Sequence, residues 1–312
     1  MSNSSAGSRL TIFCGKGGVG KTSLALAFAL WNAEQGRPVL VVTSHPLREL
    51  ALSVSLAGLK EAHPQAAANL FIIHIDAREV LANKVRQIVR SELLLKRVLA
   101  SPIYKSLIEV APGLKEIAFL GRLHQLSEER TEDGAENGVP AKYDLLIWDA
   151  PATGHFLQTL KVSQSFEMYL SGPFALLGRE VAEFFSDLSN FALLPVTLLE
   201  EMAVDETIEL CEKLASELKM YPSGVVCNMA SPLLAATDVD FEDLYGQMAR
   251  AGEAWENLKF IFDRQQHERT LFQKLRSSIK TDFYRIERRA SWTSDLNLLW
   301  DLSRQLGGLL ES

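Results

Sequence analysis

The sequence predicts an α/β fold in which a doubly wound, mostly parallel sheet carries helices on both faces. Residues 10–14 and 38–43 are short apolar runs with β-branched side chains, and a glycine-rich loop and a run of helix formers lie between them. A strand, a loop, a helix and a second strand within about 35 residues make a βαβ unit, whose strands are parallel. Continuous apolar runs of this kind are typical of parallel strands that are buried on both faces.

Later segments continue the same alternation of strands and helices. We expect further strands at residues 70–76, 143–149, 192–197, 223–228 and 258–263, and helices at residues 77–99, 114–127, 199–218 and 292–310. The polar stretch 128–141 predicts an exposed loop, and the charge-dense stretches 264–269 and 285–289 predict solvated faces. We find no internal repeat and no long linker, so we expect a single domain over residues 1–312, with a helical subdomain at about residues 155–191.

Composition and charge narrow the range of functions. The net charge of −7 over 312 residues speaks against a general nucleic-acid binder. No apolar run approaches the length that crosses a bilayer, and the polar N-terminus has no signal pattern, so we expect a cytoplasmic protein without stable membrane insertion. The cysteines Cys14, Cys211 and Cys227 form no C-x-x-C pair, which argues against structural zinc. Their spacing alone leaves a three-cysteine metalloid site open.

The glycine-rich loop carries the most specific motif. Its pattern G-x-x-x-x-G-K-[ST] runs from Gly15 to Thr22, directly after a strand and before a helix. The glycines let the backbone curl so that N–H groups point at phosphate oxygens, and the helix adds its positive N-terminus. Lys21 should reach the β- and γ-phosphates, and the Thr22 hydroxyl should ligate Mg²⁺. The alternative is a glycine-rich turn that fits the pattern by chance.

We therefore predict a P-loop NTPase that uses ATP and Mg²⁺. The residues expected to contact the nucleotide in this loop are Gly15, Lys16, Gly17, Gly18, Val19, Gly20, Lys21, Thr22 and Ser23.

The strand at residues 143–149 ends in a carboxylate that suits the same site. Asp149 can hold Mg²⁺ directly or through water if it lies opposite the loop. The alternative is an aspartate in a strand-end turn. Residues 150–155 are expected to continue as a loop, in which Gly154 and His155 sense the γ-phosphate and move when it leaves.

Residues 156–191 are rich in leucine and phenylalanine and predict two short amphipathic helices. One interpretation is that their apolar faces pack against the sheet. The other is a partly exposed apolar groove that binds a client helix.

Lys16 makes the loop resemble a narrower class of ATPases. The lysine after the first glycine gives the deviant Walker A form, K-G-G-x-G-K-[ST], which is similar to the loops of ArsA, the nitrogenase iron protein and the MinD/ParA proteins. This resemblance implies that Lys16 crosses a dimer interface to the phosphates of the partner subunit. The alternative is a solvated lysine in an exposed loop.

Taken in order, the motifs resemble the ArsA-type ATPases of arsenite pumps and the related ATPases that target tail-anchored proteins. Residues 42–50 are similar to the family's S-T-D-P-A-H-x-L, 112–113 to its P-G-I-D-E, 149–155 to its D-T-A-P-T-G-H, 195–207 to its P-E-x-L…E-T, and 226–228 to its V-x-N.

The family resemblance implies a dimeric switch that hydrolyses ATP and couples nucleotide state to a client. Lys16, Lys21 and His45 then stand at the catalytic positions, Thr22 and Asp149 at the magnesium site, and Asn228 at the position that recognises adenine. The resemblance implies a homodimer or a heterodimer with a paralogue, and a hydrophobic helix or another protein as client.

The sequence departs from the family pattern in ways that leave other functions open. His45 replaces the aspartate that positions the attacking water, and a neutral imidazole there is a poorer base with a different reach, which leaves slow or absent hydrolysis open as an alternative. The zinc clamp of the tail-anchor-targeting members is missing, and the segment 153–195 is shorter than their client-binding insertion. A nucleotide-gated binding partner with little turnover is therefore the second hypothesis. A positioning ATPase of the ParA/MinD type is the third, although residues 307–312 are too short for a membrane helix.

Overall fold

The computed structural model describes residues 9–43, 60–89, 91–111, 113–129, 142–165, 173–232, 253–288 and 295–310. Within these ranges, seven strands form one sheet: β1 Leu10–Cys14, β2 Val39–Thr43, β3 Leu70–His74, β4 Leu145–Asp149, β5 Phe191–Leu198, β6 Val225–Ala230 and β7 Phe283–Glu287. Their order across the sheet is β3-β2-β4-β1-β5-β6-β7, and the neighbouring strands are paired in parallel. The predicted doubly wound α/β fold is confirmed.

The chain enters the sheet in its middle and then winds outward in both directions. The first strand, β1, lies between β4 and β5, so successive connections run toward β3 on one side and toward β7 on the other. In such sheets the crevice at the carboxyl end of the strands, where the winding direction reverses, is the place where ligands bind. The loop that follows Cys14 lies at this point.

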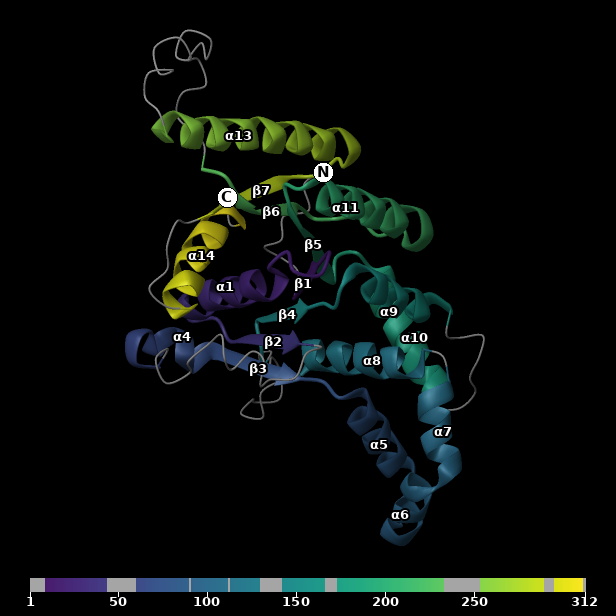
Figure 1. Ribbon diagram of the computed structural model, residues 1–312. Helices are drawn as coiled ribbons and strands as arrows, with labels where there is room; N and C mark the ends of the chain where they lie inside the picture. Colours follow the sequence, from purple (N-terminus) through teal and green to yellow (C-terminus); the bar gives the residue numbers. More distant parts are fainter. Residues whose placement is uncertain are drawn as a thin grey trace.

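Helices cover both faces of the sheet (Figure 1). The helices α1 Lys21–Glu34, α4 Pro64–Asn69 and α14 Asp295–Leu310 pack on one face, and α8 Leu114–Glu128, α9 Thr153–Ser165 and α10 Pro173–Ser186 pack on the other. The alternation of side chains along β1 separates the two cores: Leu10 and Ile12 join the α8–α10 side, and Phe13 joins the α1 side.

Near the β6–β7 edge, one helix agrees with the sequence-based assignment of a helix at residues 199–218, and another helix corrects the assignment of a strand. The helix α11 Glu201–Lys213 continues as a π-helical turn, Leu214–Leu218, and α13 Glu253–Ser278 packs beside it on β6. The strand expected at residues 258–263 is wrong, because this run belongs to α13 and exposes Phe260 and Ile261. The edge strand β7 occupies most of the stretch that predicted a solvated face.

The helix expected at residues 77–99 is interrupted. The structure has α5 Ala77–Ile88 and α6 Glu92–Ala100 instead, and α7 Pro102–Val110 follows. These three helices extend away from the sheet as an arm at the lower right of Figure 1. Among the helices of the described ranges, none combines the length and the apolar character that a membrane span requires.

Most described apolar side chains of the phenylalanine-rich region belong to the core, although Leu176 is exposed. Phe156 of α9 and Leu177 and Phe185 of α10 are buried in the core cluster that faces α8, and Phe184 packs against it. The packing interpretation therefore holds for this part. Residues 166–170, which carry other members of the apolar set, lie outside the described residues.

Candidate nucleotide-binding site

The loop between β1 and α1 has backbone conformations that require glycine. Gly15 has a φ of +133°, and a Cβ atom there would lie 2.3 Å from the backbone oxygen of Val196 on β5. Gly20 has a φ of +90°, and its Cβ atom would lie 2.4 Å from Nδ2 of Asn228. Gly17 and Gly18 are exposed, and apart from their own chain neighbours no atom of the described residues lies within 4 Å of their Cβ positions. The loop is thus closely packed where it meets Val196 and Asn228 and open at Gly17 and Gly18, as a phosphate-binding loop requires.

Lys21 begins α1 and turns back over this loop. Its side chain is largely buried, and its Nζ donates a hydrogen bond of 2.8 Å to the backbone oxygen of Lys16. Burial lowers the pKa of Lys21, and the nearby Asp149, Cys14 and Glu206 oppose this shift. A buried ammonium group whose partner is a neutral carbonyl is well placed to bind an anion.

Thr22 at the start of α1 and Asp149 at the end of β4 lie side by side in the structure. The Thr22 hydroxyl donates a hydrogen bond of 2.7 Å to Oδ2 of Asp149, which is almost fully buried. Parallel pairing of β1 with β4 sets this contact, because Phe13 is in register with Asp149. Hydroxyl and carboxylate oxygens are the ligands that Mg²⁺ prefers, so this pair has the chemistry to hold that ion.

Asn228 reaches the loop from β6. Its Nδ2 donates a hydrogen bond of 2.8 Å to the backbone oxygen of Val19, and its Oδ1 accepts one of 2.9 Å from the Met229 amide. The side chain thus holds the loop in place through a contact that the sequence did not predict. Recognition of adenine by Asn228 stays a prediction.

Lys16 has a partner that sequence reasoning missed. Its Nζ lies 3.4 Å from Oε2 of Glu206 on α11, and each side chain is about one-third exposed. The only sequence signal for this carboxylate was its place in the stretch that resembles the family's E-T motif.

The other predicted site residues have different outcomes. Ser23 lies in the first turn of α1 and is partly exposed. The loop expected at residues 150–155 ends early, because α9 begins at Thr153 and places Gly154 and His155 in its first, exposed turn. His45 lies outside the described residues.

The cysteines do not form a metal site. All three are buried, and burial raises the pKa of Cys211 and Cys227 to about 12 and also raises that of Cys14. Across the described part of the chain, no three His, Cys, Asp or Glu side chains are grouped closely enough to hold a metal ion. The metalloid site that the spacing left open therefore has no structural support there.

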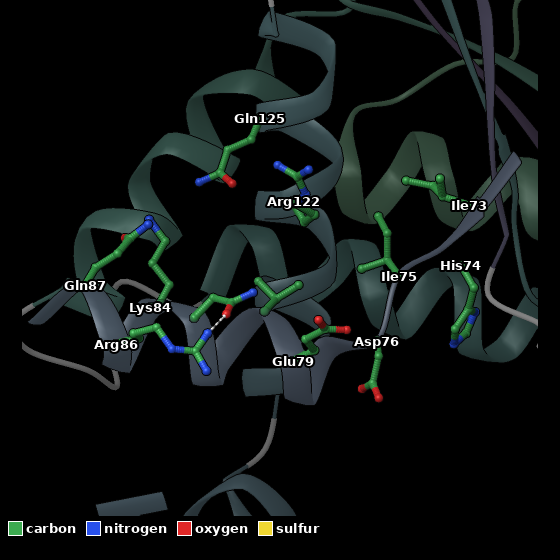
Figure 2. A pocket seen from close by; sticks show the side chains of 12 residues that line it. Ile73, His74, Ile75, Asp76, Glu79, Lys84, Arg86, Gln87, Arg122 and Gln125 are labelled. Atoms are coloured by element: carbon green, nitrogen blue, oxygen red, sulfur yellow. Dashed lines mark hydrogen bonds between the residues drawn. The ribbon is translucent and has the colours of Figure 1, made fainter. Parts of the chain in front are cut away.

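A cavity of about 670 Å³ lies away from this loop, between α5 and α8. Figure 2 shows Lys84 and Gln87 of α5 on one side and Arg122 and Gln125 of α8 on the other. Its lining includes no residue of the P-loop, and Arg122 already pairs with Glu129 at 3.0 Å. We therefore do not assign the nucleotide to this cavity.

The sheet order, the glycine cradle and the Lys21–Thr22–Asp149 arrangement define a P-loop NTPase. The ArsA-type family, described as anion-transporting ATPases, matches residues 8–220, and the chain belongs to this family. Family membership supports ATP binding and ATPase activity at the level of the family.

Curated relatives agree with this family at low identity. The chain is 24% identical to the ATPase BagA of Mycobacterium tuberculosis over 323 residues, which cover 96% of this chain and 93% of the relative. It is 28% identical to the arsenical pump-driving ATPase of Acidiphilium multivorum over 238 residues, or 70% of this chain and 39% of the relative. The match to the arsenical pump-driving ATPase of Escherichia coli is 26% identical and covers 65% of this chain and 36% of the relative. The chain thus spans well under half the length of these two pump ATPases.

Proposed function

We propose that the protein is an ATP-hydrolysing dimeric switch. In this proposal Lys21 pairs with the β- and γ-phosphates, and the loop amides bind the same oxygens. Thr22 and Asp149 hold Mg²⁺, whose charge offsets that of the phosphates. The observation that carries the proposal is the hydrogen bond of 2.7 Å between the Thr22 hydroxyl and the buried Asp149 carboxylate, beside Lys21.

A dimer that closes over the nucleotide suits the exposure of the site. Lys16 projects from the loop with a side chain about one-third exposed, so a partner subunit can reach it. Gly154 and His155 stand exposed at the start of α9, just beyond the end of β4. In the proposal, Lys16 binds the partner's nucleotide, and the start of α9 follows loss of the γ-phosphate. The dimer is formed by two copies of this chain or by this chain and a paralogue.

The arm formed by α5, α6 and α7 is our candidate for the client-binding surface. Leu93 and Leu94 of α6 are exposed, as are Ile88 before them and Ile103 after them. Leu94 and Val98 are one helical turn apart and form an apolar ridge, which suits packing against another helix. We therefore propose a hydrophobic helix as client, and we place its surface on this arm instead of the phenylalanine-rich region.

The second candidate is a nucleotide-gated binding partner that hydrolyses ATP little or not at all. His45, which stands where the family has a catalytic aspartate, favours it. In both candidates the chain acts as one domain, and the phosphate-binding residues have the same roles.

Turnover of Mg-ATP by the purified protein tests the proposal. We expect Asp149→Ala to lower kcat at least about 100-fold, the order for losing one group that stabilises charge. Asp144→Ala is the matched control, because Asp144 is exposed at the other end of β4. A wild-type rate that Asp149→Ala leaves unchanged would contradict the proposal. A negligible wild-type rate that His45→Asp raises would instead support the binding partner.

A further inference from the structure

We propose that Glu206 is a positioning residue that holds Lys16 inside its own subunit until ATP displaces it. The inference rests on the proposed function, and it adds the step that precedes closure of the dimer. Lys16 cannot pair with Glu206 and with a partner's phosphate in one position, so the ion pair competes with the closed state.

The geometry of neighbouring strands fixes this pair. β5 pairs with β1, and Cys14 is in register with Pro195, so the start of α11 lies beside the P-loop. Glu206 projects from the second turn of α11, and its Oε2 lies 3.4 Å from Nζ of Lys16. Glu206 also acts electrostatically on Lys21. One carboxylate thus pairs with Lys16 and also acts on the charge of Lys21.

The strength of the pair suits a contact that must break. Each side chain is about one-third exposed, and ion pairs at such positions contribute little and weaken with salt. A triphosphate carries more negative charge than one carboxylate, so it can take Lys16 from Glu206. When only a fraction of the chains has Lys16 released from Glu206, the apparent affinity for ATP is the intrinsic affinity multiplied by that fraction.

While Glu206 is charged, its ion pair with Lys16 opposes closure of the dimer, and this penalty is absent when Glu206 carries no charge. Removing the charge should tighten binding of ATP and favour the dimer. Removing Lys16 should abolish this gain, because Glu206 would then have nothing to hold. Simple repulsion between Glu206 and phosphate predicts something different, namely the same gain with or without Lys16.

The test compares wild type, Glu206→Gln, Lys16→Ala and the double variant. The dissociation constant of a non-hydrolysable ATP analogue with Mg²⁺ is measured by calorimetry, and dimerisation by light scattering. We expect Glu206→Gln to bind about two- to fivefold more tightly, with more dimer at a given analogue concentration. The gain should vanish in the Lys16→Ala background and shrink at high salt. Glu209→Gln, which removes the partner of Lys213 on the same helix, is the control and should match wild type.

The outcomes separate this inference from the proposed function. If wild type binds the analogue and Glu206→Gln binds it with equal or weaker affinity, the inference is overturned and the proposed function is not. An equal gain in the Lys16→Ala background would also overturn it, in favour of repulsion. If neither wild type nor variants bind the analogue, both the inference and the proposed function fail.

Discussion

At the residue scale, the candidate site combines one short motif with a side chain that reaches it from a distant strand. Gly15, Lys21 and Thr22 sit within one short motif whose spacing dictates its conformation, so their geometry follows from the sequence. The contact between Asn228 and the Val19 carbonyl joins residues 209 positions apart. Such a pairing depends on the strand order, which a single sequence does not specify.

The lowered pKa of Lys21 gives a testable pH dependence. Burial penalises the ammonium form, so the free protein should lose this proton at a lower pH than the ordinary value of 10.5. Bound phosphate favours the ammonium form, so ATP should raise the pKa, and binding at alkaline pH should take up a proton. The ε-carbon resonance of Lys21, assigned by its loss in Lys21→Arg, reports both values. A free-protein midpoint at or above 10.5 would contradict the burial argument.

At the element scale, the central strands were predictable because they are buried on both faces. β1, β2 and β4 are continuous apolar runs, and the sequence located each of them. The edge was not predictable in the same way. β7 carries charged residues because it lies at the edge of the sheet that the described residues form, and the apolar run at residues 258–263 belongs to an exposed part of α13. Short apolar runs do not by themselves distinguish a strand from a helix.

The contact between α1 and α14 predicts a large difference between two adjacent glycines. A Cβ atom on Gly307 would lie 2.1 Å from Cδ2 of Trp31, whereas within the described part of the chain no packing neighbour lies within 4 Å of that position on Gly308. Gly307→Ala should therefore lower the free energy of unfolding by about 1–3 kcal/mol through overpacking. Gly308→Ala should leave it unchanged or raise it by about 0.5–1 kcal/mol, because alanine favours the helix. Urea unfolding measures both, and equal stabilities would contradict the close packing.

At the scale of the whole molecule, we propose that nucleotide and client bind to different parts of the chain. The P-loop lies at the carboxyl end of the central strands, and the arm extends from the β3 side of the sheet (Figure 1). The segment 44–59 joins β2 to the part of the chain that leads into β3 and α5, and it contains His45.

The client surface predicts a selective loss of binding. The double variant Leu93→Ser with Leu94→Ser should weaken binding of a fluorescent helix of about 20 leucine and alanine residues by at least about tenfold. Stability should change little, because both side chains are exposed. Phe260→Ser removes an exposed aromatic side chain from α13 and is the control. Equal binding by wild type and the double variant would place the client elsewhere.

The affinity of the protein for ATP with Mg²⁺, measured by calorimetry beside Lys21→Ala, tests whether the P-loop binds nucleotide. We expect wild type to bind one nucleotide per chain with a saturable isotherm. We expect the affinity of the variant to be at least about tenfold weaker, because a charge-assisted pair contributes roughly 1.5–3 kcal/mol. Equal affinities, or no binding by wild type at saturating ATP, would rule out the proposed nucleotide site.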